Sequence, residues 1–231
     1  MGFTHDKYLK GLNKMSIFNP AERTPEEAVY CEGVDNLIAK RIDAEISNGK
    51  PRHAVYLIAK LFGMANNKVR LYSDHLEHTV AITDESSPES ELDIYGNSEV
   101  VDRVANFLGN KDTEVAIVVE NDITNIKTHP LYKRIQALVN AKQLFGKFEI
   151  RKLTEDAKYS LIQADFGNHF FVSDDRAYRL ERDTDESSYK AQANFNNKET
   201  AGKLLSLFDD FHWKNSDMVF SAAHNNIIKS V

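Results

Sequence analysis

The stretch Glu114–Glu120 (EVAIVVE) constrains the fold of this chain more than any other. Valine and isoleucine are β-branched residues that favour extended backbone. A near-continuous apolar run of this length is typical of a strand whose two faces are both buried. Such strands occur where helices cover both sides of a sheet, so the run predicts the interior of an α/β sheet.

Other strands and helices alternate around this run. Alternation of polar and apolar residues predicts a strand over 68–72, and 148–153 is a further predicted strand. Helices are expected from Ser98 to Gly109 and from Pro130 to Gly146. This order implies right-handed crossovers. The predicted fold class is therefore α/β, an α-β-α sandwich with a mostly parallel mixed sheet and an N-terminal helical segment.

The N-terminal part is predicted to be helical. Thr24-Pro25-Glu26-Glu27 combines a cap residue, a proline at the first helical position and the glutamate of a capping box. We expect this helix to continue to about Asn48-Gly49, and a buried helix to follow over 52–62. Residues 1–23 lack periodicity and are expected to form an arm without a signal peptide.

The C-terminal part has a different pattern. Strands are expected over 161–164, 169–173 and 177–181, with a tight turn at Asp174-Asp175. Asn196 is expected to cap a helix that ends at Trp213. The acidic, serine-rich stretch 83–91 is expected to be a solvated loop. The predicted organisation is an arm (1–23), one domain (24–213) and a tail (214–231).

The segments FFVSDDRAYRLE and NFNN, together with the apolar stripe of the helix ending at Trp213, resemble a half-domain of the phospholipase D superfamily. The motif of that family is H-x-K-x4-D. If Asp174 is the aspartate, the histidine position falls on Gly167 and the lysine position on His169. If His169 is the histidine instead, the lysine and aspartate positions hold Phe171 and Arg176. Neither register gives a complete triad.

The resemblance implies chemistry that this chain lacks. In active relatives the histidine attacks phosphorus, the lysine neutralises a phosphoryl oxygen, and two motifs meet across a twofold interface. The resemblance therefore implies a homodimer and a non-catalytic scaffold that acts through protein–protein interaction, a kind of protein associated with bacterial regulation or antiviral defence.

Two other functions stay open. One is a divergent phosphodiesterase or nuclease with His169 and Asp174 as catalytic residues. The other is a nucleotide or phosphate-ligand sensor, with Arg176, Arg179 and Asn194 as the binding residues. The plainer interpretation of His169 and Asp174 is a surface histidine and a turn aspartate. No cofactor and no metal is expected for any of these functions.

Composition and the remaining motifs further limit the partners, the location and the metal sites that can be expected. The net charge of −6 does not favour nucleic acid as a partner. A single cysteine, Cys31, fits the cytoplasm and is expected to pack in the core. No run is long and apolar enough to predict a membrane span. His75 and His78 are metal-capable side chains in Asp74–His78, but a polar connection after a strand is the favoured interpretation.

Overall fold

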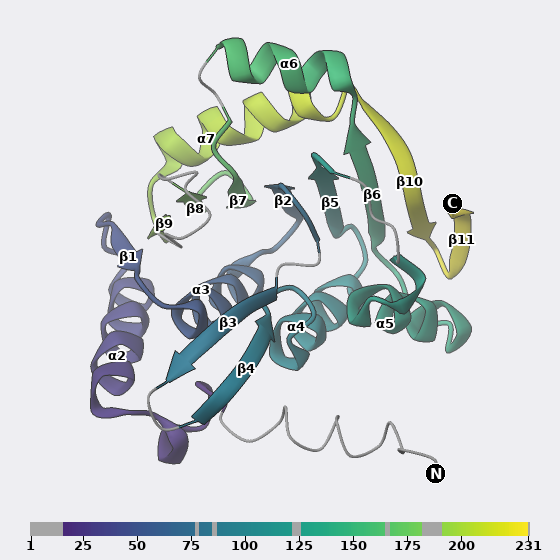
Figure 1. Cartoon of the computed structure of the whole chain (residues 1–231). Coiled ribbons are helices and arrows are strands. Elements are labelled where there is room, and N and C mark those ends of the chain that lie inside the picture. The colour runs from purple at the N-terminus through teal and green to yellow at the C-terminus, as the bar shows by residue number, and fades with distance from the viewer. Residues whose placement is uncertain are drawn as a thin grey trace.

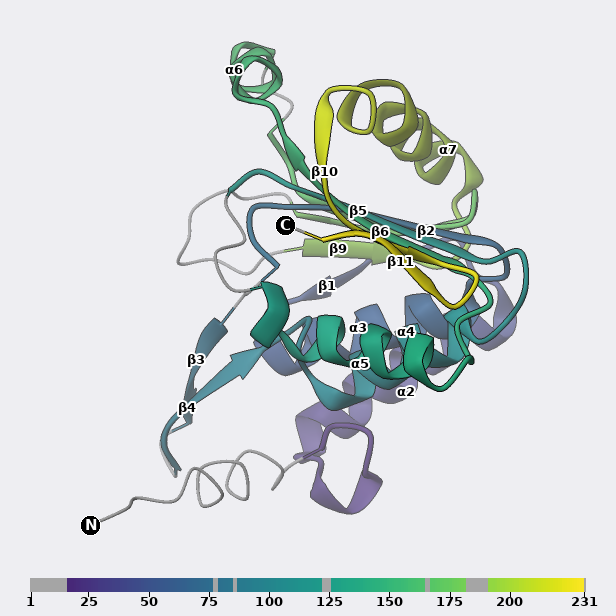
Figure 2. The same ribbon diagram turned by 90° about the vertical axis from the view of Figure 1, so that its right-hand side faces the viewer.

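A nine-stranded mixed sheet lies between two layers of helices (Figure 1). The computed structural model describes residues 16–76, 79–84, 87–121, 126–164, 167–181 and 191–230, with the backbone alone for 79–84, 87–92, 229 and 230. Helices α2 to α5 cover one face of the sheet, and α6 and α7 lie on the other (Figure 2). The predicted α/β sandwich with a mixed sheet is confirmed.

The strands of the main sheet are ordered β1-β9-β8-β7-β2-β5-β6-β10-β11. They are β1 (Ile46–Asn48), β2 (Lys68–Ser73), β5 (Glu114–Val119), β6 (Lys147–Leu153), β7 (Phe170–Ser173), β8 (Ala177–Glu181), β9 (Ala191–Asn194), β10 (Ser216–Ala223) and β11 (Asn226–Ser230). The central strands β2, β5 and β6 pair in parallel. The other neighbouring pairs in this sheet are antiparallel.

Each α-helix in the described part of the chain except α3 follows a residue whose side chain accepts a hydrogen bond from a backbone N–H of the first turn. The helices are α2 (Pro25–Lys40), α3 (Pro51–Met64), α4 (Ser98–Leu108), α5 (Pro130–Asn140), α6 (Glu155–Gln163) and α7 (Lys198–Leu207), with short 3-10 turns at Pro20–Glu22 and Ile126–Thr128 and a π-helical turn at Phe208–His212. The capping box predicted at α2 is confirmed. The Thr24 hydroxyl accepts from the Glu27 N–H, and the Glu27 carboxylate accepts from the Thr24 N–H.

Strand β5 is buried on both faces, as predicted. Val115, Ile117 and Val119 point into the core under α3, α4 and α5, whereas Ala116 and Val118 point into the core under α6 and α7. Each of these side chains is at most 2% exposed. Burying a Val or Ile side chain contributes roughly 1.5–3 kcal/mol, so this strand stabilises both layers of the sandwich.

The first helix is shorter than the sequence predicts. It ends at Lys40, because Arg41 takes a left-handed conformation with φ 51° and donates its N–H to the last carbonyls of the helix. Residues 46–48 instead form β1, which pairs with β9 at the edge of the sheet. In the sequence, Ile46 fits the spacing of the apolar residues of the preceding helix, but in the structure it belongs to β1.

Three other predictions are wrong. Residues in the expected loop 83–91 belong to β3 (Thr79–Asp84) and β4 (Ser87–Asp93), a separate antiparallel hairpin. Pro88 is tolerated there because each strand of a two-stranded sheet has a free edge. The expected strand 161–164 is instead the end of α6, which Thr154 caps through the Ala157 N–H. Residues 216–230 of the expected tail form β10 and β11 of the main sheet.

The remaining boundaries differ by small amounts. Asn97 and Asn197 are the cap residues of α4 and α7, one position from Ser98 and Asn196. Helix α5 ends at Asn140 and so does not reach Gly146. Residues 1–15 of the expected arm lie outside the described part of the chain. Among the described residues, no helix is long and apolar enough to cross a membrane.

Candidate functional site

His169 lies at the end of the sheet to which the carboxyl ends of the parallel strands β2 and β5 point. Its ring contacts two carboxylates: Nε2 is 3.1 Å from Glu120 Oε1, and Nδ1 is 3.2 Å from Glu181 Oε2. Glu120 directly follows β5, and Glu181 ends β8. The Glu181 N–H donates to the His169 carbonyl at 2.9 Å, so the antiparallel pairing of β7 and β8 sets these two residues opposite each other.

Two further residues fix the carboxylates in place. The Tyr72 hydroxyl donates to Glu120 Oε1 at 2.5 Å. The Arg179 Nη1 donates to Glu181 Oε1 at 2.8 Å, and its Nε donates to Asn48 Oδ1 at 3.3 Å. Because Arg179 and Glu181 are two apart on one strand, they share a face of the sheet. We call Tyr72, Glu120, His169, Arg179 and Glu181 the His169 cluster.

The electrostatics of the cluster favour a charged imidazole. Burial by itself lowers the pKa of His169, but the hydrogen bonds to Glu120 and Glu181 and the charges of both carboxylates outweigh it and raise the pKa to about 9. Burial raises the pKa of Glu181, yet His169 and Arg179 lower it to about 2. Burial also raises the pKa of Glu120, but the hydrogen bonds that it accepts from His169 and Tyr72 outweigh burial, so its pKa is lowered. At neutral pH the site therefore holds an imidazolium between two carboxylates.

This charge state decides what His169 can do. A protonated imidazole has no lone pair with which to attack phosphorus, because both ring nitrogens carry hydrogen. The carboxylates of Glu120 and Glu181 oppose the positive charges of His169 and Arg179, so the cluster offers no net positive charge to a phosphate. As it stands, the arrangement is an ion-pair network that ties β5, β7 and β8 together.

Asp174 lies at the other end of β7 from His169. The two residues are five positions apart along extended chain, roughly 16 Å at about 3.3 Å per residue, so the structure does not bring the predicted catalytic pair together. The Asp174 carboxylate accepts from the backbone N–H groups of Asn66, Asn67 and Lys68 and from the Asn66 amide, at 2.9–3.2 Å. Burial raises its pKa, but these donors outweigh the burial and lower it. Asp174 anchors the turn to the start of β2.

The predicted ligand-binding residues are dispersed. Arg179 is 3% exposed and belongs to the His169 cluster. Asn194 is 1% exposed. Its amide donates to Asp43 Oδ1, and its own oxygen accepts from the Asn196 N–H, so it holds two loops together. Arg176 lines a pocket at the Asp174 end of the sheet, whose lining does not include Arg179 or Asn194.

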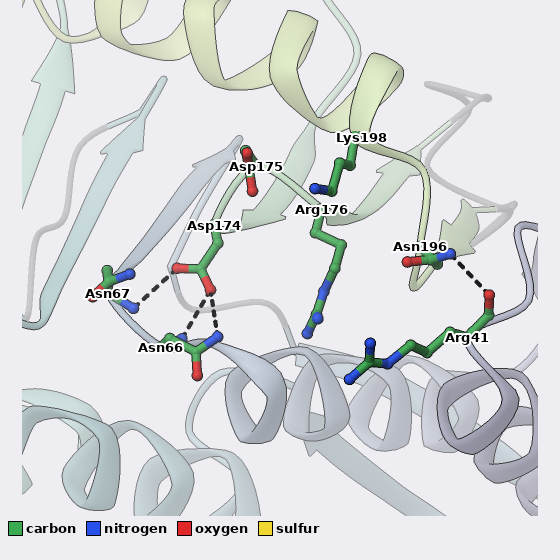
Figure 3. A pocket seen from close by; sticks show the side chains of 8 residues that line it. All are labelled: Arg41, Asn66, Asn67, Asp174, Asp175, Arg176, Asn196 and Lys198. Carbon is green, nitrogen blue, oxygen red and sulfur yellow. Dashed lines mark hydrogen bonds between the residues drawn. The ribbon is translucent and has the colours of Figure 1, made fainter.

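That pocket has a volume of about 300 Å³ (Figure 3). It lies where the turn after β7, the loop before β2, the end of α2 and the start of α7 meet. It is lined by Arg41, Asn66, Asn67, Asp174, Asp175, Arg176, Asn196 and Lys198.

The other sequence candidates do not form a site. His75 Nε2 contacts Asp74 Oδ2 at 3.1 Å, and His78 lies outside the described residues. Within the described ranges, no three His, Cys, Asp or Glu side chains are arranged to hold a metal ion. Cys31 is fully buried in α2, and burial raises the pKa of its thiol, so it is a core residue as expected.

The sequence did not indicate the partners of His169. Glu120 lies 49 positions away in the chain and Glu181 lies 12 away. One signal was present: Glu120 is a charged residue directly after a buried parallel strand, the position at which open α/β sheets place functional side chains. Arg41 and Lys198 were missed as well, because each contributes to the pocket from the end of a helix.

No protein-family model and no curated protein sequence matches the chain. Among solved structures, it is similar to TrmBL2, described as an archaeal chromatin protein with a novel mode of DNA binding, at 11% identity over 93% of this chain and 69% of that one, with a TM-score of 0.47. It is also similar to Nuc from Salmonella typhimurium, a phospholipase D family member, at 12% identity over 77% and 98% of the two chains, with a TM-score of 0.44. NucT from Helicobacter pylori gives 10% identity, 77% and 99% coverage, and a TM-score of 0.45.

Proposed function

We propose that the chain is a non-catalytic phospholipase-D-like scaffold that acts by protein–protein interaction and that a second copy of itself is one partner. The observation that carries the first part is the contact of His169 with two carboxylates. An attacking histidine must be neutral and must face its substrate, whereas both nitrogens of His169 are occupied by Glu120 and Glu181. The site therefore supports cohesion of the sheet better than it supports phosphoryl transfer.

The outer face of α6 supports the proposal that a second copy of the chain is a partner. Tyr159 and Ile162 are 65% and 64% exposed and lie three positions apart, so they share one face of the helix. Helix α6 stands at the margin of the sheet, away from α7 (Figure 2). Large apolar side chains that adjoin on a surface mark a contact site. A second copy that presents the same face would cover Tyr159 and Ile162 of both copies in a twofold interface.

A phosphodiesterase assay tests the absence of catalysis. The wild-type protein and His169→Ala are incubated with bis-p-nitrophenyl phosphate, with and without divalent metal ions. We expect no release of p-nitrophenol above background from either protein. Turnover by the wild type that His169→Ala abolishes would overturn the scaffold proposal.

Size-exclusion chromatography with light scattering tests the dimer. We expect the wild type to have twice the mass of the 26.3 kDa chain, and the double variant Tyr159→Ser/Ile162→Ser to be a monomer. Val29 is 72% exposed on α2, so Val29→Ser is the matched control and should stay dimeric. A wild type that is monomeric at all concentrations would remove the self-association proposal.

A divergent phosphodiesterase is the second candidate, and one observation favours it. The His169 cluster lies at the carboxyl ends of parallel strands, where open α/β sheets bind ligands, and the charge of Lys158 acts on Glu120. In that case water would attack phosphorus, the P–O bond to the leaving group would break, and the imidazolium of His169 would act as a general acid that protonates the leaving oxygen. Hydrolysis that falls as the pH rises through about 9 would support this candidate over the scaffold.

A further inference from the structure

The pocket at the Asp174 end of the sheet has features that the His169 cluster lacks. Arg41 comes from the end of α2, Arg176 from the turn after β7, and Lys198 from the first position of α7. Figure 3 shows the Arg41 and Arg176 side chains extending toward one another, with the Lys198 amino group near the base of Arg176 and directed toward Asp175. Within the described ranges, none of the three makes an ion pair.

Of these three cations, Arg176 is half-buried, whereas Arg41 and Lys198 are exposed. The chain carries an excess of acidic residues, with a net charge of −6. The buried Arg70 pairs with Asp209 and the half-buried Arg151 pairs with Glu149, whereas the half-buried Arg176 has no carboxylate partner among the described residues. Cations that line one pocket repel one another, and an anion bound among them would relieve that repulsion.

The acidic residues of the pocket do not cancel this charge. Asp174 directs its carboxylate away from the cations and accepts four hydrogen bonds from Asn66, Asn67 and Lys68 (Figure 3). The other carboxylate is that of Asp175, which is exposed. The start of α7 also faces the pocket, and the N-terminus of a helix carries partial positive charge. The lining thus holds three full positive charges against two negative ones.

The walls of the pocket are fixed without a ligand. The Asn196 amide donates to the Arg41 carbonyl at 2.8 Å and so joins the end of α2 to the loop before α7. Asp174 fixes the opposite wall at the start of β2. The backbone positions of the three cations are therefore set in advance, and this lowers the entropy cost of binding.

We infer that this pocket binds the phosphate group of a small polar phosphomonoester, of the sugar-phosphate class. A phosphomonoester carries close to two negative charges at neutral pH, which suits the three cations, and arginine can bind phosphate through two parallel hydrogen bonds. The eight lining residues are all polar or charged. They offer amides to hydroxyl groups and no aromatic ring on which a nucleobase could stack.

Isothermal titration calorimetry tests the inference on the full chain. The probes are glucose 6-phosphate, inorganic phosphate, glucose and AMP, and the variants are Arg176→Gln and Lys198→Gln. Lys133→Gln on α5 is the control, because it removes one charge from an exposed site outside the pocket. We expect glucose 6-phosphate to bind, inorganic phosphate to compete with it, and glucose alone not to bind. Each pocket variant should weaken the affinity at least tenfold, and Lys133→Gln should leave it within twofold.

Three outcomes would overturn the inference. One is that the wild type binds none of the phosphate probes. Another is that Lys133→Gln weakens binding as much as Arg176→Gln, because the effect would then be one of overall charge. The third is that AMP binds at least tenfold more tightly than glucose 6-phosphate, because the base would then be the recognised group. All three are independent of the scaffold proposal, since the pocket and the His169 cluster share no residue.

Discussion

His169 and Asp174 flank β7 from opposite ends and face different surroundings. His169 is held between carboxylates from β5 and β8, whereas Asp174 accepts hydrogen bonds from the start of β2. The two residues that the sequence offers as a catalytic pair are thus separated by the length of the strand. One stabilises an ion-pair network, and the other anchors a turn beside a cationic pocket.

Removing the Asp174 carboxylate should destabilise the fold. Asp174→Ala leaves the N–H groups of Asn66, Asn67 and Lys68 without their acceptor and places alanine at φ 52°. We expect a loss of about 1–3 kcal/mol in the free energy of unfolding, measured by urea denaturation. Asp175→Ala, at the exposed neighbouring position, should change it by less than about 0.5 kcal/mol. Equal losses for the two variants would contradict the anchoring role.

Two glycines should respond in opposite ways to alanine. A Cβ on Gly146 would lie 2.8 Å from the Thr113 carbonyl oxygen and would also meet the Thr113 hydroxyl, which is held by hydrogen bonds to Phe107 and Asn110. Gly146→Ala should therefore cost about 1–3 kcal/mol of stability. A Cβ on Gly202, within α7, has nothing within 4 Å. Gly202→Ala should add about 0.5–1 kcal/mol, and thermal unfolding measures both.

Local signals in the sequence predicted the fold where capping chemistry or burial decided it. The capping box of Thr24 and Glu27 correctly predicted a helix, and the apolar run before Glu120 correctly predicted a strand. In both cases the residues that determine the element are neighbours in the sequence. Strand β10 was missed because it pairs with β6, a partner more than 60 residues away, and β11 was missed because it joins the sheet only through β10. Leu161 was misassigned because short apolar runs fit a strand and a helix equally well.

The candidate site was less accessible from the sequence. The sequence offers His169 as a candidate, but its surroundings depend on Glu120 and Glu181, which the order of the strands brings to it. Strand β7 lies between β2 and β8, and no pattern of spacing within one segment indicates that order. The cationic pocket was missed for the same reason, since Arg41 and Lys198 belong to helix ends that meet in three dimensions.

The stabilising effect of the cluster should depend on pH. The pKa of His169 is raised from 6.5 to about 9, so its contribution is complete below pH 6.5 and is lost as the pH rises through about 9. The pKa of Glu181 is lowered from 4.5 to about 2, so its contribution is complete above pH 4.5 and is lost as the pH falls through about 2. The cluster should therefore stabilise the fold most between pH 4.5 and 6.5.

His169→Gln isolates this dependence. The difference in unfolding free energy between the wild type and His169→Gln should shrink by up to about 3 kcal/mol from pH 6 to pH 10, since one pKa unit corresponds to about 1.4 kcal/mol. Urea denaturation at a series of pH values measures it. His75→Gln removes a more exposed histidine outside the cluster and controls for the loss of an imidazole. A difference for His169→Gln that stays constant over this range would contradict the ion-pair role.

The protonation of His169 in solution tests the central claim most directly. Long-range proton–nitrogen NMR spectra of the wild-type protein, assigned with His169→Gln, follow both ring nitrogens of this residue as the pH is raised. We predict that His169 stays protonated at both nitrogens through neutral pH and titrates at about 9. A His169 that is neutral at pH 7, titrating at or below 6.5, would contradict the claim and restore it as a possible nucleophile.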